Sequence, residues 1–400
     1  MPDFPEPRVP IRPVLSFGSF LGRRDAGVPA VDDAGEVDWL TSGRVAIALG
    51  LLNAQVGAGD EVLLPAYNCS TMVDAVTATG ATPVFYRLRP DLSVDMADVA
   101  ARVSTRSRAL LVVHFFGFPQ PAIAAAQSFC RRSGLLLIED CAHAWFGACQ
   151  EGALGSFGDF AVTSAMKFFP VSDGGCLIYP SPGRTPPGLQ GAGTGFELKS
   201  VLNNLERAVR YGRLQPFTLP VRALLALKDL LWRAIKRHRQ AARSQAELGP
   251  ESSYGGYGID TAWLHVRMSR HSRSLIRRLP RERMVQIRRG NFTRLLHALQ
   301  AVPGARPLFP QLPDQVVPYV FPLIVAGVDT VFPVLKRAGV PILRWEDIDR
   351  SVCPVSTQYS SQLLQFPCHQ EVTGAELEWM IRTITAALHA AGRTAGAAAR

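Results

Sequence analysis

The sequence predicts an α/β protein with a mostly parallel, doubly wound sheet. Short apolar runs suited to strands alternate with stretches suited to helices, which is typical of this class. The run Leu135 to Ile138 is apolar throughout, as expected of a strand buried on both faces. The chain has 400 residues, more than one core usually holds, so we expect a second, smaller domain. The strand runs are Glu61 to Leu64, TPVFYRL, LLVVHFFG and Leu135 to Ile138, with helices over Asp95 to Val103 and Ile123 to Arg132.

Composition narrows the functional classes without choosing one. Hydrophobic residues make up 47% and charged residues 19%, as in ordinary soluble globular proteins. The seven cysteines show no CxxC pair or metal-ligand spacing, which favours reduced thiols, a cytoplasmic location and no metal site. We expect neither a signal peptide nor a transmembrane helix, because no long continuous apolar run occurs. The net charge of +10 attracts anions, but no motif indicates nucleic acid.

Two residues that carry chemistry are expected at one edge of the sheet. Asp140 follows the run Leu135 to Ile138, and Lys167 follows a second run, Phe160 to Thr163. The carboxyl ends of strands are where open α/β sheets bind ligands. Apolar neighbours desolvate the lysine, which lowers its pKa toward the free amine. Such a pair suits pyridoxal 5′-phosphate (PLP) chemistry: the lysine links covalently to the cofactor, and the carboxylate keeps the pyridine nitrogen protonated.

A phosphate site is expected where the first large helix begins. Ser42 is a good N-cap for a helix starting near Arg44. A helix N-terminus offers free N–H groups and partial positive charge, so Gly43 and Arg44 are candidate phosphate contacts. The Arg44 guanidinium has a local carboxylate as its alternative partner. The inner face of this helix is expected to carry Val45, Ala48, Leu49 and Leu52.

Together these motifs resemble the DegT-type sugar aminotransferases, a branch of the fold-type-I PLP enzymes. The motifs occur in the family's order and cover most of the chain, and their combination is specific although each alone is weak. The resemblance implies a fold-type-I PLP transferase: a large domain with the mostly parallel doubly wound sheet, and a smaller C-terminal α+β domain. The segments are Ser42-Gly43-Arg44, GDEVLLPAY before Asn68, VVHFFGFP, IEDCAHAWFGA, GDFAVTSAMK and DGG.

The resemblance also implies further site residues. His143 matches a position, usually glutamine and in some members histidine, that bonds the cofactor's phenolic oxygen. It lies one turn beyond Asp140 if a helix starts there. Ser164 best matches the phosphate-binding serine, with Thr163 as the alternative. Asn68, directly after GDEVLLPAY, is another candidate cofactor contact. With Lys167 and Asp140, His143 completes the expected catalytic set.

Three positions depart from the family pattern. Arg44 stands where the family has a phosphate-binding threonine. Cys69 stands at the position best aligned with a ring-stacking aromatic residue, and Tyr67 is the nearest aromatic side chain. His265, in the segment HVRMS, stands for an asparagine that reaches the partner subunit's cofactor phosphate. Whether Tyr67 stacks on the ring or belongs to the core, and whether His265 replaces the asparagine, both stay open.

The remaining chain divides by composition. We expect an N-terminal arm over residues 1–30, a large PLP-binding domain over 31–290 with a basic helical insertion near 190–250, and a small domain over 291–400. Within the insertion, Val221 to Arg243 is a basic amphipathic helix. It is expected to pack on the protein itself, with docking on an anionic membrane as the alternative. The arginines between 270 and 289 are expected on a solvated or substrate-facing surface.

Five further residues complete the expectations. His114 closes a strand and is expected to be a satisfied structural histidine. Trp345 and His369 are candidate substrate contacts by position. Thr373 and Glu376 have the spacing of a capping box at the start of the last helix.

The resemblance implies a homodimeric aminotransferase that moves an amino group, usually from glutamate, to a keto sugar carried on a nucleotide. The pathway would be cell-surface polysaccharide or secondary-metabolite biosynthesis. One alternative is another PLP reaction, such as elimination or decarboxylation. Related dehydratases have histidine in place of the lysine, so Lys167 argues against that group. A second alternative is a non-catalytic regulatory protein that retains the fold. The departures from the family pattern at Arg44, Cys69 and His265 are the evidence for this alternative.

Overall fold

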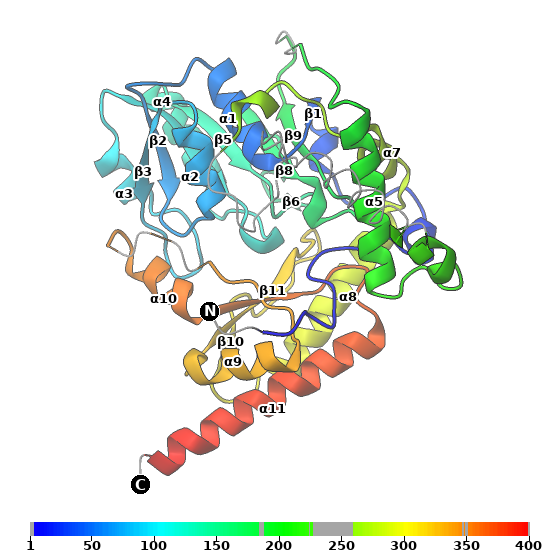
Figure 1. The fold of residues 1–400 in the computed structure, drawn as a ribbon. Helices are drawn as coiled ribbons and strands as arrows, with labels where there is room; N and C mark the ends of the chain where they lie inside the picture. Colours follow the sequence, from blue (N-terminus) through cyan, green and yellow to red (C-terminus); the bar gives the residue numbers. More distant parts are fainter. Residues whose placement is uncertain are drawn as a thin grey trace, which may run out of the picture.

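Two sheets organise the molecule (Figure 1). The computed structural model describes residues 4–183, 188–223, 225–226, 259–345, 348 and 351–398. The larger sheet has seven strands and the smaller one three, and a short ribbon pairs β6 (Ala148–Cys149) with β7 (Gly152–Ala153). Most of the predicted helix Val221 to Arg243 lies outside the described residues.

The seven-stranded sheet is mostly parallel, which confirms the predicted class. Its order is β1-β9-β8-β5-β4-β2-β3. The five strands from β8 to β3 run parallel, whereas β9 runs antiparallel to both of its neighbours, β8 and β1. The strands are β1 (Glu36–Leu40), β2 (Glu61–Pro65), β3 (Thr82–Tyr86), β4 (Ser107–Val113), β5 (Leu136–Asp140), β8 (Phe160–Ser164) and β9 (Gly175–Tyr179).

Helices cover this sheet, and α1 is the most deeply buried of them. It packs against β8, β9 and α2, so every residue from Arg44 to Leu51 is buried. Leu52, predicted on the inner face, is instead 39% exposed, because burial from several sides follows no single stripe and ends at the last turn. Ser42 caps the helix as predicted, accepting the Val45 N–H. The helices are α1 (Gly43–Asn53), α2 (Ser70–Thr77), α3 (Met96–Arg102) and α4 (Ile123–Ser133).

A second hydrophobic core forms around the three-stranded sheet, in the order β10-β11-β12. Helix α8 (Arg281–Leu299) passes the predicted domain boundary at residue 290 without a break. Thr373 and Glu376 form the predicted capping box at α11. The other elements are β10 (Ala305–Pro307), β11 (Val320–Val325), β12 (Leu363–Pro367), α9 (Val328–Ala338), α10 (Pro354–Gln362) and α11 (Gly374–Ala398).

The N-terminal arm runs between these two parts and touches both (Figure 1). Arg8 N–H bonds the Gly339 carbonyl near α9, and the Pro10 carbonyl bonds the His369 ring at 2.9 Å. Further along, the Pro13 carbonyl accepts from Arg207 of α5 (Thr194–Arg210), and α7 (Arg270–Arg278) packs beside α5. Within the ranges given above, no helix combines the length and apolar character that crossing a bilayer requires.

Candidate active site

Most of the predicted site residues meet at one cavity beside the carboxyl ends of β5 and β8. Strand β5 ends at Asp140, and β8 ends at Ser164, directly before the short turn of 3-10 helix Ala165–Lys167. These strands are neighbours, with Asp140 level with Val162. The cavity is lined by Ser42, Gly43, Arg44, Cys69, Asp140, His143, Ser164, Lys167 and Trp345, among others.

The buried Asp140 and the half-buried Lys167 are coupled through their charges. Burial raises the pKa of Asp140 above its usual range, while the charge of Lys167 opposes the shift. Burial lowers the pKa of Lys167, and the charges of Cys69 and Asp140 oppose that change. Among the described residues, the only hydrogen bond donated to the Asp140 carboxylate comes from Ala142 N–H, at 2.8 Å to Oδ1. The rest of this carboxylate is therefore left for a ligand.

His143 faces the same cavity, although not from a helix. The residues after Asp140 form a turn in which Ala144 N–H bonds the Cys141 carbonyl, so the helical placement considered from the sequence is wrong. His143 stacks on Tyr319, with ring centroids 4.6 Å apart. Burial, and then the charge of Lys167, lowers its pKa well below 6.5, so the ring is neutral.

The tautomer of His143 follows from its backbone partner. Phe116 N–H donates to Nδ1 at 3.4 Å, so the ring proton is on Nε2. Phe116 has φ of 59°, a left-handed conformation that is unusual for a bulky residue. Tyr319 N–H bonds the Phe116 carbonyl at 2.8 Å and holds this conformation from the second sheet. The site thus uses a strained peptide to fix a histidine tautomer.

The opposite end of the cavity is suited to an anion. Ser42, Gly43 and Arg44 at the start of α1 line it together with Ser164. Gly175 permits this approach, since a Cβ there would lie 2.3 Å from the Ser42 carbonyl carbon. Arg44 is buried, and burial lowers its pKa while the nearby charge of Asp74 opposes the shift. Both partners considered for Arg44, a phosphate and a local carboxylate, are therefore still open.

Of the other predicted site residues, some line the cavity and others are buried away from it. Cys69 lines the cavity, whereas Tyr67 is fully buried behind it and packs on Trp345 at 5.0 Å between centroids. Asn68 is buried and donates to the Pro65 and Ala66 carbonyls instead of lining the cavity. Trp345 lines the cavity, as its position in the sequence predicts.

Two histidines lie away from this cavity. The His369 ring is tied to the arm through the Pro10 carbonyl, and burial lowers its pKa to about 3. His265 is exposed, and its reach toward a partner subunit stays a prediction.

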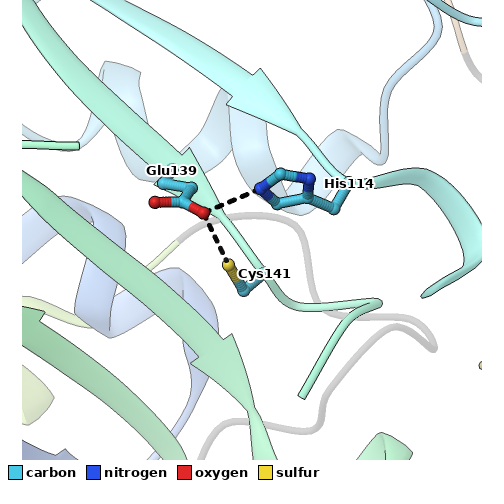
Figure 2. A group of neighbouring side chains, drawn as sticks. All are labelled: His114, Glu139 and Cys141. Carbon is cyan, nitrogen blue, oxygen red and sulfur yellow. Dashed lines mark hydrogen bonds and ion pairs between the residues drawn. The ribbon is translucent and has the colours of Figure 1, made fainter. Parts of the chain in front are cut away.

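A hydrogen-bonded network lies on the other face of β5 (Figure 2). Glu139, the neighbour of Asp140, is fully buried and accepts from His114 Nε2 at 2.9 Å and from the Phe157 N–H at 2.9 Å. Gln120 N–H donates to His114 Nδ1, so both ring nitrogens of His114 are bonded, as expected for a structural histidine. Cys141, Gly155 and Gly158 also donate to Glu139.

Sequence reasoning missed Arg288, the best-satisfied cation near the site. Its neighbours in the sequence place it among surface arginines, yet it is fully buried in α8. Its guanidinium donates to the Lys167 carbonyl at 2.8 Å, to Gln370 Oε1 at 2.9 Å and to the carbonyls of Pro318 and Tyr319, and lies 4.4 Å from the Phe168 ring centroid. Arg288 thus links the backbone of Lys167 to the segment that leads into β11. A signal existed: Met284, Arg288, Phe292 and Leu295 share one helical stripe, so the arginine falls within an apolar face.

Comparison with known proteins agrees with this geometry. Residues 36–184, which include Asp140, His143 and Lys167, match the DegT/DnrJ/EryC1/StrS aminotransferase family. The match is confined to that segment, which is less than half of the chain. It is 37% identical over 153 residues to a dTDP-4-dehydro-2,3,6-trideoxy-D-glucose 4-aminotransferase of Saccharopolyspora spinosa, which is 38% of this chain and 40% of that protein.

A second relative extends the range of sugars. The chain is 34% identical over 146 residues to a UDP-N-acetyl-3-dehydro-alpha-D-glucosamine 3-aminotransferase of Acidithiobacillus ferrooxidans, covering 34% of this chain and 38% of that protein. These matches therefore span about 40% of the length of the curated relatives. The fold extends further. The PMP form of a putative sugar aminotransferase, Spr1654 of Streptococcus pneumoniae, has a TM-score of 0.62 at 15% identity and covers 93% of this chain and 89% of that one.

The residues of the cavity fit PLP. Asp140, desolvated and short of donors, suits a cationic pyridine N–H. His143 Nε2–H suits a phenolic oxygen, and the N-terminus of α1 with Arg44 and Ser164 suits a phosphate. These are three separate chemical matches on one cavity that also holds a lysine of lowered pKa.

Proposed function

We propose that this protein is a PLP-dependent aminotransferase that transfers an amino group, with glutamate as donor, to a keto sugar linked to a nucleotide. The observation that carries the proposal is the convergence of Asp140 and Lys167 from neighbouring strand ends on one cavity. The two curated relatives, whose names specify nucleotide-linked keto sugars, support the substrate class.

PLP, when bound, would act as an electron sink for the carbon that gains or loses the amino group. The side chains of the protein would hold and orient the cofactor and move the proton. Lys167 would hold the cofactor covalently and, as a free base, would move a proton, which its lowered pKa favours. Asp140 would keep the pyridine nitrogen protonated, and His143 would donate from Nε2 to orient the ring.

A homodimer in the cytoplasm completes the proposal. The arm has three exposed apolar side chains, Phe17, Phe20 and Leu21, and the ring centroid of Phe17 lies 5.8 Å from that of Phe217, which is also exposed. Such a patch suits burial against a second copy of the chain. All seven cysteines are free thiols, as expected in a reducing compartment.

Borohydride reduction tests the proposal. Protein loaded with PLP should keep the cofactor covalently after reduction, and peptide mapping should place it on Lys167. A matched Lys167→Ala variant should release it. Attachment to another lysine, or no attachment at all, would remove Lys167 from its role and with it the proposed reaction.

Amino transfer needs its own test, because a regulatory protein could retain the cofactor. Loaded protein mixed with glutamate should lose the absorbance of the lysine-bound cofactor and release 2-oxoglutarate in a single half-reaction. Asp140→Asn should slow this half-reaction while the reduced protein still carries the label on Lys167. Labelling without any half-reaction, across a panel of amino donors, would favour the regulatory alternative.

A further inference from the structure

A second cavity lies between the arm and α5, outside the proposed cofactor site. Its volume is about 570 Å³. Its lining includes three arginines, Arg12 from the arm and Arg207 and Arg210 from α5. We call this space the arginine cleft. Two carboxylates border it: Glu206 lines it, and Glu6 pairs with Arg210. Both glutamates are exposed, so water screens much of their charge, and the buried part of the cleft stays cationic.

The arginines are held close together at an electrostatic cost. Arg207 donates to the carbonyls of Val171 and Pro13, at 3.2 and 3.1 Å, and not to a carboxylate. Burial and then the charge of Arg12 lower the pKa of Arg207 to about 10. Burial is the larger cause of this shift, and the charge of Arg12 adds to it, as expected of two like charges that line one cleft. An oxyanion bound between them would offset that repulsion and accept their N–H groups in pairs.

The arginine cleft lies beside the reacting lysine. Met166 lines the cleft, while the next residue, Lys167, lines the cofactor cavity. The charge of Arg12 is also one of the causes that lower the pKa of Lys167. A substrate whose reacting carbon is at Lys167 is therefore within electrostatic range of the cleft.

We propose that the arginine cleft binds the multiply charged oxyanion group of a substrate. The proposal rests on the proposed function. Two substrates of that reaction carry such a group: a nucleotide-linked sugar has a diphosphate, and glutamate has two carboxylates. Planar guanidiniums bind both kinds of group through paired hydrogen bonds, so the chemistry is shared and only an experiment separates the sources.

The test measures binding of unreactive anions to the PLP-loaded protein by calorimetry. The probes are uridine diphosphate, pyrophosphate and glutarate. Arg12→Gln and Arg210→Gln should each weaken at least one probe by about tenfold, the usual loss of one charge-assisted contact, and added salt should weaken it further. Arg131→Gln, an exposed arginine on α4, makes the same charge change elsewhere and should leave affinity within about twofold. Arg207 is left intact because it also fastens the arm.

Each possible result of these binding measurements either supports or overturns the proposal. Weakening confined to the two phosphate probes assigns the arginine cleft to the nucleotide-linked sugar, and weakening confined to glutarate assigns it to the amino donor. Weakening of all three assigns it to both in turn. Equal affinities in Arg12→Gln, Arg210→Gln and Arg131→Gln, or no binding of any probe, overturn the cleft as a site. Lys167 labelling is measured on the same samples, so equal affinities in the three variants, or no anion binding at all, together with normal labelling refute the cleft and not the proposed function.

Discussion

The two faces of strand β5 hold adjacent carboxylates that the structure treats in opposite ways. Glu139 is surrounded by donors: His114, three backbone N–H groups and the Cys141 thiol. These bonds hold its pKa below the usual range, although burial alone would raise it. Asp140 has one donor from the described part of the protein, and burial raises its pKa.

The difference separates a structural carboxylate from one reserved for a ligand. A buried charge with its full set of hydrogen bonds stabilises the fold, whereas a buried charge without them destabilises it until a partner arrives. Glu139 fixes the end of β5 to the loop that contains Gly155 and Phe157. Asp140 depends on the cationic group that binds in the cavity. Substitutions at the two positions should therefore affect different measurements.

The largest effect is expected from Asp140→Asn on turnover. A neutral amide cannot hold a pyridine nitrogen protonated, so the half-reaction should slow roughly a hundred- to a thousand-fold. The unfolding free energy of the cofactor-free protein should stay the same or rise, because a desolvated charge is removed. Stopped-flow absorbance and urea unfolding measure the two quantities. A near-normal half-reaction rate in Asp140→Asn would show that Asp140 has a structural role and no role in the reaction.

Glu139→Gln should reverse that pattern. The amide keeps one acceptor oxygen but turns an NH₂ group toward backbone donors, so we expect a loss of about 2–3 kcal/mol in unfolding free energy. The half-reaction, measured in the folded fraction, should change much less than in Asp140→Asn. Urea unfolding of the two variants side by side makes the comparison. Equal stability losses at both positions would show that the two faces do not differ.

The sequence predicted the fold and the position of the Asp140–Lys167 pair because both follow from general rules. Apolar runs define buried strands, and neighbouring strand ends meet at one edge. The same alternation along a strand places Glu139 and Asp140 on opposite faces, but nothing local to Glu139 shows which donors the distant residues 114 and 155 to 158 will bring.

Other parts of the site depend on long-range packing. His143 lines the cavity from a turn and not from the helix considered for it, and its ring stacks on Tyr319, whose N–H also bonds the carbonyl of the left-handed Phe116. Arg288 was missed because composition shows a basic helix, whereas only the apolar stripe shows which arginine is buried. Local patterns thus locate strand ends, and tertiary contacts decide what surrounds them.

The pH dependence of stability should sharpen the comparison, with smaller effects. The folded pKa of Glu139 lies below its ordinary 4.5, so its stabilisation is complete above that value and is lost as the pH falls through the folded pKa. The folded pKa of Asp140 lies above its ordinary 3.8, so its destabilising charge is relieved as the pH falls through that folded pKa. If the acid dissociation constant of one group differs tenfold between the folded and the unfolded state, the contribution of that group to stability changes by about 1.4 kcal/mol.

Urea unfolding of cofactor-free protein across the acidic range makes this test. Acidification should shrink the stability deficit of Glu139→Gln relative to the native protein. It should also shrink any stability gain of Asp140→Asn, so the two differences approach zero from opposite sides. Differences of the same sign, or differences that do not depend on pH, would contradict the assigned pKa directions.

The smallest effect is expected from the conservative exchange His143→Gln. The neutral ring donates from Nε2 while Nδ1 accepts the Phe116 N–H, and a glutamine amide offers the same donor and acceptor pair. His143→Gln should therefore cost about 1 kcal/mol or less, which is under tenfold in the half-reaction rate.

The matched control is His143→Phe, which keeps an aromatic ring beside Tyr319 but removes the donor and leaves the Phe116 N–H unpaired. It should lose more activity than His143→Gln, because a buried donor without a partner is costlier than a conservative exchange. Since burial holds the pKa of His143 well below 6.5, the native rate profile should show no inflection near 6.5 from this ring. An inflection there that disappears in His143→Gln would show that His143 titrates in the working enzyme. The fixed tautomer set by the Phe116 peptide would then be wrong.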